Sequence, residues 1–248
     1  MAVRRVAYPV ACIAMAAPRT PKGRTAVVAQ RLAEEYPEAL CELNHHGPFE
    51  LLAATILSAQ TTDARVNLVT PALFARYRDA YSLAAADPAE LEQIVRSTGF
   101  YQAKARNLIA MAVALVERYG GEVPNALDDL VTLAGVGRKT ANVVRSVAFG
   151  LPGLPVDTHV GRLARRLGLT VEDDPVKVEL ALNAFVRPAE RGPFSLRTIL
   201  HGRRVCHAKK PDCAACVLED ICPSSLLRQR PSQRRGGRAG ISEPQMKS

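Results

Sequence analysis

The sequence predicts an all-α protein. Apolar residues recur at helical spacing through most of the 248-residue chain, and no segment shows the strict alternation of a half-buried strand. Glycine, proline and aspartate breakers separate the apolar segments at intervals typical of short helices. With 48% hydrophobic residues, the chain is long enough to bury a substantial core in one large or two smaller domains.

Each predicted helix is bounded by residues that suit its ends. Asp63 and Asp87 precede or open two helices, where carboxylates are favoured by the positive end of the helix. Asn125 is expected to cap another helix, which carries Asp128 and Asp129 in its first turn. The predicted helices span residues 25–36, 49–60, 63–78, 81–85, 88–98, 102–119, 126–133, 138–149, 157–168, 175–186 and 193–202.

A glycine turn joins two of these helices at residues 133–141, which read LAGVGRKTA. Gly135 and Gly137 would allow positive φ angles and the close approach of a partner to the backbone. The amides of the turn and of the following helix N-terminus would then face outward as an anion site, for which phosphate is the natural ligand. An ordinary helical hairpin is the alternative, because a G-x-G pair alone is a weak signal.

Four cysteines near the C-terminus follow the spacing C-x6-C-x2-C-x5-C: Cys206, Cys213, Cys216 and Cys222. Four thiolates gathered within such a short segment can hold an iron–sulfur cluster or a zinc ion. Buried reduced thiols or two disulfides are the simpler alternative. Zinc ribbons usually carry two separated C-x2-C pairs and this chain has one, so the spacing favours iron–sulfur and leaves zinc open.

Together these motifs resemble the endonuclease III family of the helix-hairpin-helix superfamily. The glycine hairpin with Lys139, the VDTH segment at 156–159 and the cysteine spacing agree with the family in order and distance. The match covers about residues 24–224. Ala134 stands where the family usually has proline, which loosens the turn slightly. The resemblance implies a bifunctional DNA glycosylase and AP lyase with a 4Fe–4S cluster.

The resemblance also implies a two-lobed helix-hairpin-helix glycosylase fold. A six-helix domain would span 41–151, and the iron–sulfur domain would combine 24–40 with 152–225. The DNA would lie in the cleft between the lobes. Residues 1–23 are expected to be a disordered extension, and 226–248 a disordered basic tail.

The expected catalytic residues are Lys139 and Asp157. Release of a base from its sugar develops positive charge at the anomeric carbon, which the carboxylate of Asp157 can stabilise. The amine of Lys139 can attack the same carbon and leave a covalent imine, and β-elimination from that imine nicks the strand. Alone, Lys139 could equally bind phosphate and Asp157 could equally cap a helix.

The base must leave the duplex to be reached, so residues that fill the gap are expected. By resemblance, Gln60 of the LSAQTTD segment at 57–63 would occupy it, and Phe100, where leucine is common, would act as a wedge. Ser58, Asp63 and His159 would line the lesion pocket, although His159 is more simply a structural residue. The predicted DNA-binding residues are Gln60, Phe100, Gly135, Val136, Gly137, Arg138, Thr140, Lys209 and Lys210.

The net charge of +9 is concentrated at the two ends of the chain. Residues 1–25 and 223–248 each carry +5, which leaves the body at −1. Such tails add salt-sensitive affinity for a polyanion, whereas specific binding depends on locally placed cations. We expect the cysteine cage to shape the loop that presents Lys209 and Lys210 to the DNA backbone.

The expected partner is double-stranded DNA that contains oxidised pyrimidines or abasic sites, bound by a monomer.

Cys12 and Cys41 remain as free thiols, which is typical of a reducing compartment. The apolar stretch 6–17 resembles a weak signal peptide, but a disordered extension is favoured, and no run is long enough to span a membrane. A cytoplasmic, nucleoid-associated location is expected. An adenine-excising relative and a non-catalytic DNA-binding module are the alternative functions.

Overall fold

The computed structural model describes residues 18–228, and no residue in that range belongs to a β-strand, which confirms the all-α prediction. Residue Cys12 and most of both predicted tails lie outside the described range. The α-helices are α1 Pro21–Glu35, α2 Pro48–Leu57, α3 Asp63–Arg76, α4 Ala80–Ala84, α5 Pro88–Val95, α6 Tyr101–Tyr119, α7 Leu127–Leu130, α8 Arg138–Val147, α9 Thr158–Arg166, α10 Pro175–Asn183 and α11 Arg191–Arg204. Short 3₁₀ turns lie at Arg96–Thr98, Pro188–Glu190, Cys213–Ala215 and Glu219–Ile221.

Most helix starts lie within two residues of the prediction, and the start of α1 and the cap of α7 differ from it for local reasons. Helix α1 begins at Pro21 because the Thr20 hydroxyl accepts from the Gly23 amide at 3.1 Å and proline suits the first turn. The predicted disordered extension to residue 23 therefore ends too late. The expected Asn125 cap is also wrong, since Ala126 is the N-cap of α7. The Asn125 carbonyl accepts instead from Arg145 at 3.1 Å.

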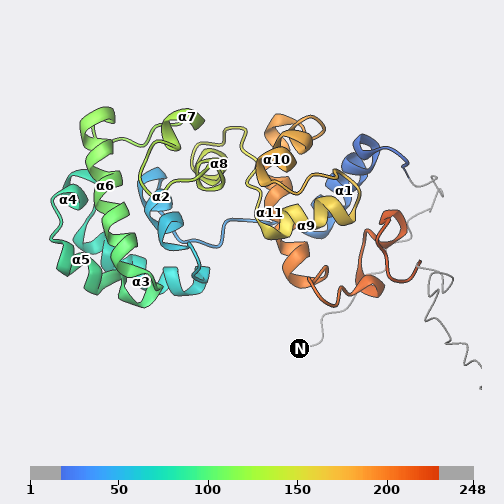
Figure 1. The fold of residues 1–248 in the computed structure, drawn as a ribbon, viewed down its shortest axis with the longest axis horizontal. Coiled ribbons are helices and arrows are strands. Elements are labelled where there is room, and N and C mark those ends of the chain that lie inside the picture. Colours follow the sequence, from blue (N-terminus) through green and yellow to red (C-terminus); the bar gives the residue numbers. More distant parts are fainter. Residues whose placement is uncertain (1–17, 229–248) are drawn as a thin grey trace, which may run out of the picture.

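The helices pack around two separate hydrophobic cores (Figure 1). The first core is built from α2 to α8 and contains Leu52, Leu73 and Leu108, all fully buried. The second core joins α1 to α9, α10 and α11, and contains Leu32 and Leu182. Complete burial of one such side chain contributes about 2 kcal/mol. Helix α8 contacts both α2 and α11, so it lies where the two cores meet.

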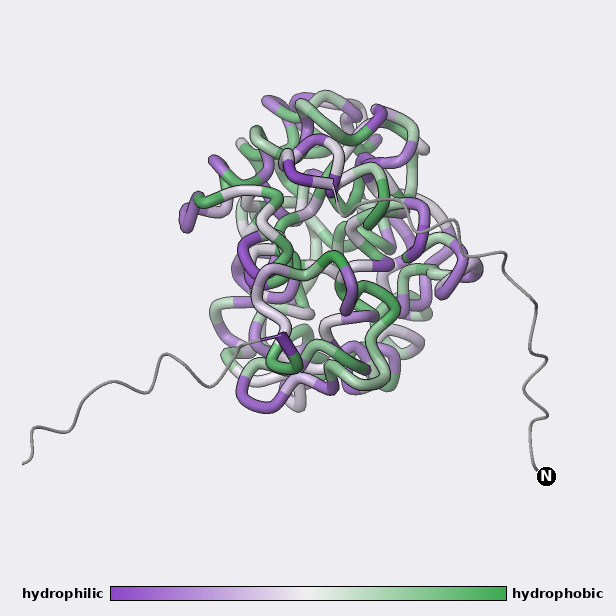
Figure 2. Tube along the Cα trace, turned by 90° about the vertical axis from the view of Figure 1, so that its right-hand side faces the viewer, coloured by the Kyte–Doolittle hydropathy of each residue, from purple (hydrophilic) through white to green (hydrophobic). Residues whose placement is uncertain are grey.

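Hydropathy along the chain follows this packing. Figure 2 shows hydrophilic and hydrophobic residues recurring along the tube throughout the described chain, as expected of helices with one face on a core. Among the helices between residues 18 and 228, none combines the length and apolar character needed to cross a bilayer.

The N-terminal helix is fastened to the C-terminal half of the chain. The Arg24 guanidinium donates to the Gly168 carbonyl at 2.8 Å. Arg31 donates to the Val217 carbonyl at 2.9 Å and pairs with Asp220. These bonds hold α1 against segments more than a hundred residues away in sequence and complete the second core.

A half-buried ion pair joins α8 to α10. The guanidinium of Arg138 makes two bonds to the Glu179 carboxylate, at 2.7 and 2.9 Å, and Asn142 donates to the same carboxylate at 3.0 Å. Glu179 is only 5% exposed, so these three donors are what compensates the burial of its charge. The pair therefore ties the first core to the second beside the glycine turn.

Candidate active site

A cavity of about 100 Å³ lies between the two cores. Its walls come from α2, α3, α8, α11 and the start of α9. Lys139 and Asp157 both line it, so the structure brings the two predicted catalytic residues to one space. Of the predicted lesion-pocket residues, Ser58 and Asp63 also line the cavity.

Lys139 occupies the first turn of α8, directly after the glycine turn. Gly135 has φ +76°, which favours glycine, and a Cβ there would lie a tight 3.1 Å from the Asn107 side chain. Gly137 has φ −87° and caps α8 through its backbone alone, so the expected positive φ at this position is wrong. Within the described chain, the amides of residues 138–140 have no hydrogen-bond partner, which leaves them available to an anion.

Asp157 is the N-cap of α9. One of its oxygens, Oδ1, accepts from the backbone amides of His159 and Val160, both at 2.9 Å. Within the described residues, Oδ2 has no protein hydrogen-bond partner. Capping therefore orients the carboxylate and leaves one oxygen for a substrate, so the structural and catalytic roles are compatible.

Arg203 also lines the cavity, a position that no motif in the sequence assigns to it. From the last turn of α11 it donates to Glu42 at 2.5 Å and to Asp63 at 3.3 Å. These ion pairs join Arg203, on a helix of the second core, to two carboxylates on the side of the first core. Cys41 also lines the cavity, and burial raises the pKa of its thiol, which favours the neutral form. No motif in the sequence placed either residue at the cavity.

The structure places other predicted residues outside the cavity. The ring nitrogen Nδ1 of His159 contacts Arg162 at 3.1 Å, and His159 does not line the cavity, which agrees with its structural alternative. The Arg138 side chain is engaged by Glu179 and is therefore not a free phosphate ligand. The side chain of Val136 is buried at 6% exposure, and its amide donates to Leu133, so neither part is available to DNA. Thr140 is half-buried in the first turn of α8.

The two predicted gap-filling residues lie on neighbouring loops. Gln60 and Phe100 are both exposed, and both have left-handed backbone conformations, with φ 55° and φ 48°. The Thr61 hydroxyl bonds to the Thr98 carbonyl, which holds the two loops side by side. Neither residue lines the cavity, and Phe100 lines a separate, open pocket together with Tyr101 and Arg106.

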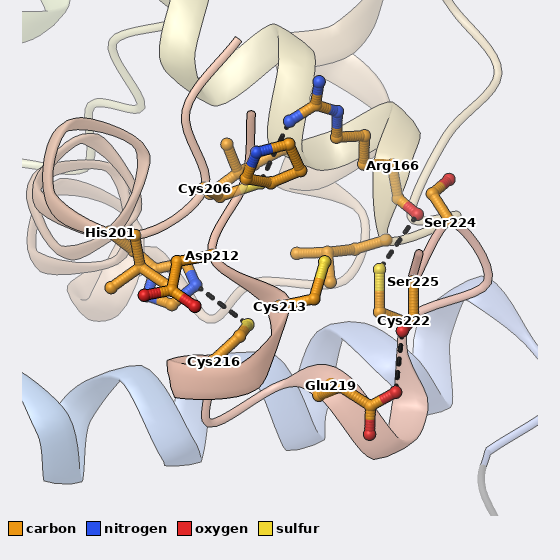
Figure 3. Close-up of a pocket in the computed structure, with 14 residues that line it drawn as sticks. Arg166, His201, Cys206, Asp212, Cys213, Cys216, Glu219, Cys222, Ser224 and Ser225 are labelled. Carbon is orange, nitrogen blue, oxygen red and sulfur yellow. Dashed lines mark hydrogen bonds between the residues drawn. The ribbon is translucent and has the colours of Figure 1, made fainter. Parts of the chain in front are cut away.

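The four C-terminal cysteines line a second cavity, of about 30 Å³, together with Leu163, Leu167, His201 and Val205 (Figure 3). None of the five described cysteines forms a disulfide, which excludes that alternative. Arg166 donates to the Cys206 sulfur at 3.3 Å, and a His201 ring nitrogen lies 3.3 Å from the Cys216 sulfur. Burial lowers the pKa of His201 to about 4, so its imidazole is neutral.

Arg166, from the end of α9, is hydrogen-bonded to the loop that follows Cys206. Arg166 donates to the carbonyls of His207 and Ala208 at 2.7 and 2.6 Å. Lys209 and Lys210 are exposed at the outer end of this loop. Among residues 18–228, no group of three or more His, Cys, Asp or Glu side chains is arranged to hold a metal ion.

Comparison with known proteins agrees with this arrangement. A family model described as HhH-GPD superfamily base excision DNA repair protein matches residues 53–188, which include Lys139 and Asp157. Endonuclease III of Synechocystis sp. is 49% identical over 205 residues, which cover 82% of this chain and 94% of the relative. The chain belongs to the endonuclease III family. It is therefore a DNA glycosylase and AP lyase of base excision repair, and the adenine-excising and non-catalytic alternatives are not favoured.

Two solved structures of the endonuclease III family share the fold. A non-covalent endonuclease III–DNA complex has a TM-score of 0.79 and 44% identity, and covers 84% of this chain and 97% of its own. A trapped endonuclease III–DNA covalent intermediate has a TM-score of 0.79 and 45% identity, and covers 84% of this chain and 99% of its own. The second protein is described as forming a covalent bond to DNA, as expected of a lyase.

Proposed function

We propose that this endonuclease III family member removes oxidised pyrimidines from duplex DNA and cleaves the resulting abasic site through a Schiff base on Lys139. The observation that carries the proposal is that Lys139 and Asp157 line one cavity between the two cores. The endonuclease III–DNA complexes of similar fold support DNA as the partner.

The proposed reaction begins when the uncharged amine of Lys139 attacks the anomeric carbon of the damaged nucleotide. The bond to the base breaks, and its electron pair leaves with the base, which takes up a proton. The free oxygen of Asp157 stabilises the positive charge that develops on the sugar. Ring opening then yields an imine with Lys139. Loss of a proton from the adjacent carbon breaks the bond to the 3′ phosphate and nicks the strand.

The proposed DNA contacts surround this cavity. The amides of Gly135 and Gly137 in the glycine turn, and those of residues 138–140 in the first turn of α8, would bind a backbone phosphate. Lys209 and Lys210 would contact phosphates from the cysteine-bounded loop. Gln60 and Phe100 would enter the gap left by the flipped nucleotide, and Ser58 and Asp63 would contact the extruded base. Action as a cytoplasmic monomer, and the division between a six-helix domain over 41–151 and an iron–sulfur domain, remain predictions.

Incision assays on single-lesion oligonucleotides test the proposed substrate. We expect thymine glycol, dihydropyrimidine and oxidised cytosine duplexes to be cut, and an abasic duplex to be cut without prior base release. Borohydride should cross-link the protein to each, because it reduces the imine to a stable amine. Release of adenine from a mispair, with no cleavage of oxidised pyrimidines, would contradict the proposal.

We further propose that Cys206, Cys213, Cys216 and Cys222 hold a 4Fe–4S cluster. Thiolates are the ligands that such clusters require, and the apolar wall of the second cavity suits a buried cofactor. A single zinc ion would need all four sulfurs about 2.3 Å from one point. All four thiols line this one cavity, and the single C-x2-C pair in their spacing is less typical of zinc ribbons, which favours the cluster. When bound, the cluster would serve as a cross-link that holds the loop of Lys209 and Lys210.

Metal analysis of the purified protein should find about four iron and four sulfide per chain, and no stoichiometric zinc. A Cys213→Ser variant should lose iron and the broad visible absorbance of the cluster, because one ligand is removed. The matched control is Cys41→Ser, which replaces a half-buried free cysteine that does not line the second cavity and should retain full iron content. Zinc in place of iron and sulfide in freshly purified protein would overturn the assignment.

A further inference from the structure

One lysine is buried inside the first core without belonging to the cavity. Lys104, in the first turn of α6, is only 4% exposed. Among residues 18–228 it is the only lysine or arginine classed as buried. Burial lowers the pKa of its amine. A buried ammonium is costly unless all of its donors are satisfied.

All three donors of the Lys104 ammonium have partners. Its Nζ lies 2.8 Å from the Leu57 carbonyl, 2.8 Å from the Thr61 hydroxyl and 2.7 Å from the Thr98 carbonyl. The Thr61 hydroxyl in turn bonds to the Thr98 carbonyl. The result is a closed network in which one side chain joins the end of α2, the loop after it, and the 3₁₀ turn before α6.

These anchor points flank the two loops that carry Gln60 and Phe100. Gln60 lies between Leu57 and Thr61, and Phe100 lies between Thr98 and Lys104 itself. The Lys104 amide also donates to the Phe100 carbonyl at 3.0 Å. Gln60 and Phe100 are the only non-glycine residues with positive φ among those the structure describes. Such conformations persist only where surrounding contacts over-determine them, and both sit on the Lys104 network.

We propose that Lys104 is a positioning residue that holds the Gln60 and Phe100 loops in their strained conformations as a single unit. This inference rests on the proposed function, since it assigns both loops to the gap left by the flipped nucleotide. A loop that is already ordered avoids the entropy cost of ordering when it enters DNA. Removing the ammonium would free two carbonyls and a hydroxyl and let the loops relax independently.

The test compares two substrates of the same enzyme, with Lys104→Met as the variant. Methionine retains an unbranched stem and removes all three donors. On duplex DNA with thymine glycol, where a base must be extruded and replaced, we expect single-turnover base release to fall by about 10-fold or more. On a single-stranded abasic oligonucleotide there is no opposite strand and no gap to fill, so imine formation, measured by borohydride trapping, should change by less than about 2-fold.

A Lys177→Met variant is the control, because Lys177 is exposed in the first turn of α10 and lies outside both cavities. It should behave as wild type on both substrates. Combining Lys104→Met with Gln60→Ala provides a second measurement. If Lys104 only stabilised the fold, the effect of Gln60→Ala on duplex cleavage would be the same with and without Lys104→Met. Once Lys104→Met has released the loop, adding Gln60→Ala should slow duplex cleavage far less than it does in the wild type.

If Lys104→Met does not fold, Thr61→Val removes one partner of the network and leaves the buried ammonium in place. Thr61→Val should slow base release from the thymine glycol duplex by less than Lys104→Met does, and should leave trapping on the single-stranded abasic oligonucleotide unchanged. Equal losses on both substrates, or additive losses with Gln60→Ala, would overturn the positioning role. Failure of the wild type itself to cut either substrate would instead refute the proposed function, and so the two outcomes are distinguishable.

Discussion

Replacing Lys139 by alanine should abolish borohydride cross-linking to an abasic duplex and lower strand incision by about 1000-fold or more. The substitution removes the amine that attacks the sugar, and nothing else in the proposed reaction forms the imine. DNA affinity should be largely retained, because the unpaired amides of residues 138–140 and the exposed Lys209 and Lys210 remain. Denaturing gels of the cross-linked product and a binding titration measure the two effects separately.

Lys177→Ala is the matched control for this experiment. Lys177, like Lys139, is an exposed lysine in the first turn of a helix, but it does not line the cavity between the cores. Its replacement should leave cross-linking unchanged. Undiminished trapping by the Lys139→Ala protein would show that another amine forms the imine and that the assigned nucleophile is wrong.

Asp157→Asn should slow base release by about 100- to 1000-fold while DNA affinity changes little. The substitution removes the negative charge that stabilises the developing cation. It retains the cap of α9, because asparagine is as good an N-cap as aspartate and its side-chain oxygen can still accept from the amides of His159 and Val160. Single-turnover cleavage of a thymine glycol duplex and a melting curve together separate lost chemistry from lost stability.

Asp174→Asn provides a control with the same local geometry. Asp174 caps α10 by accepting from the amides of Val176 and Lys177, both at 3.0 Å, and it does not line the cavity. Both variants lose one charge at a capped helix N-terminus, so any effect of capping itself should be equal in the two. If Asp157→Asn cleaves damaged DNA as fast as Asp174→Asn, the carboxylate has no role in the reaction.

The helical architecture was predictable because its signals are local. Breakers such as Pro48, Gly99 and Asp174 separate the helices, and apolar periodicity marks the face of each helix that meets a core. The misplaced ends have local causes too: Thr20 extends α1, and Ala126 replaces Asn125 as a cap without a side-chain bond. Gly135 and Gly137 were both expected to allow a positive φ, and only Gly135 has one.

Part of the candidate site was also predictable. Lys139 and Asp157 are eighteen residues apart, each at the start of a helix, and the family resemblance paired them before any contact was known. His159, Arg138 and Val136 were assigned to the site from the same motifs, but their side chains contact protein partners. A motif identifies a segment, whereas the direction of each side chain depends on what packs against it.

The order of residues was sufficient for the helices, the glycine turn, the cysteine spacing and the choice of Lys139 and Asp157, because each depends on neighbours along the chain. Packing alone determined that Arg203 reaches Asp63 across 140 positions, that Glu179 holds Arg138, and that Lys104 joins two loops. These contacts join elements that are far apart in the sequence, and no local pattern of residues predicts which distant elements meet. Their energies arise from burial and charge pairing, which exist only once the two cores have come together.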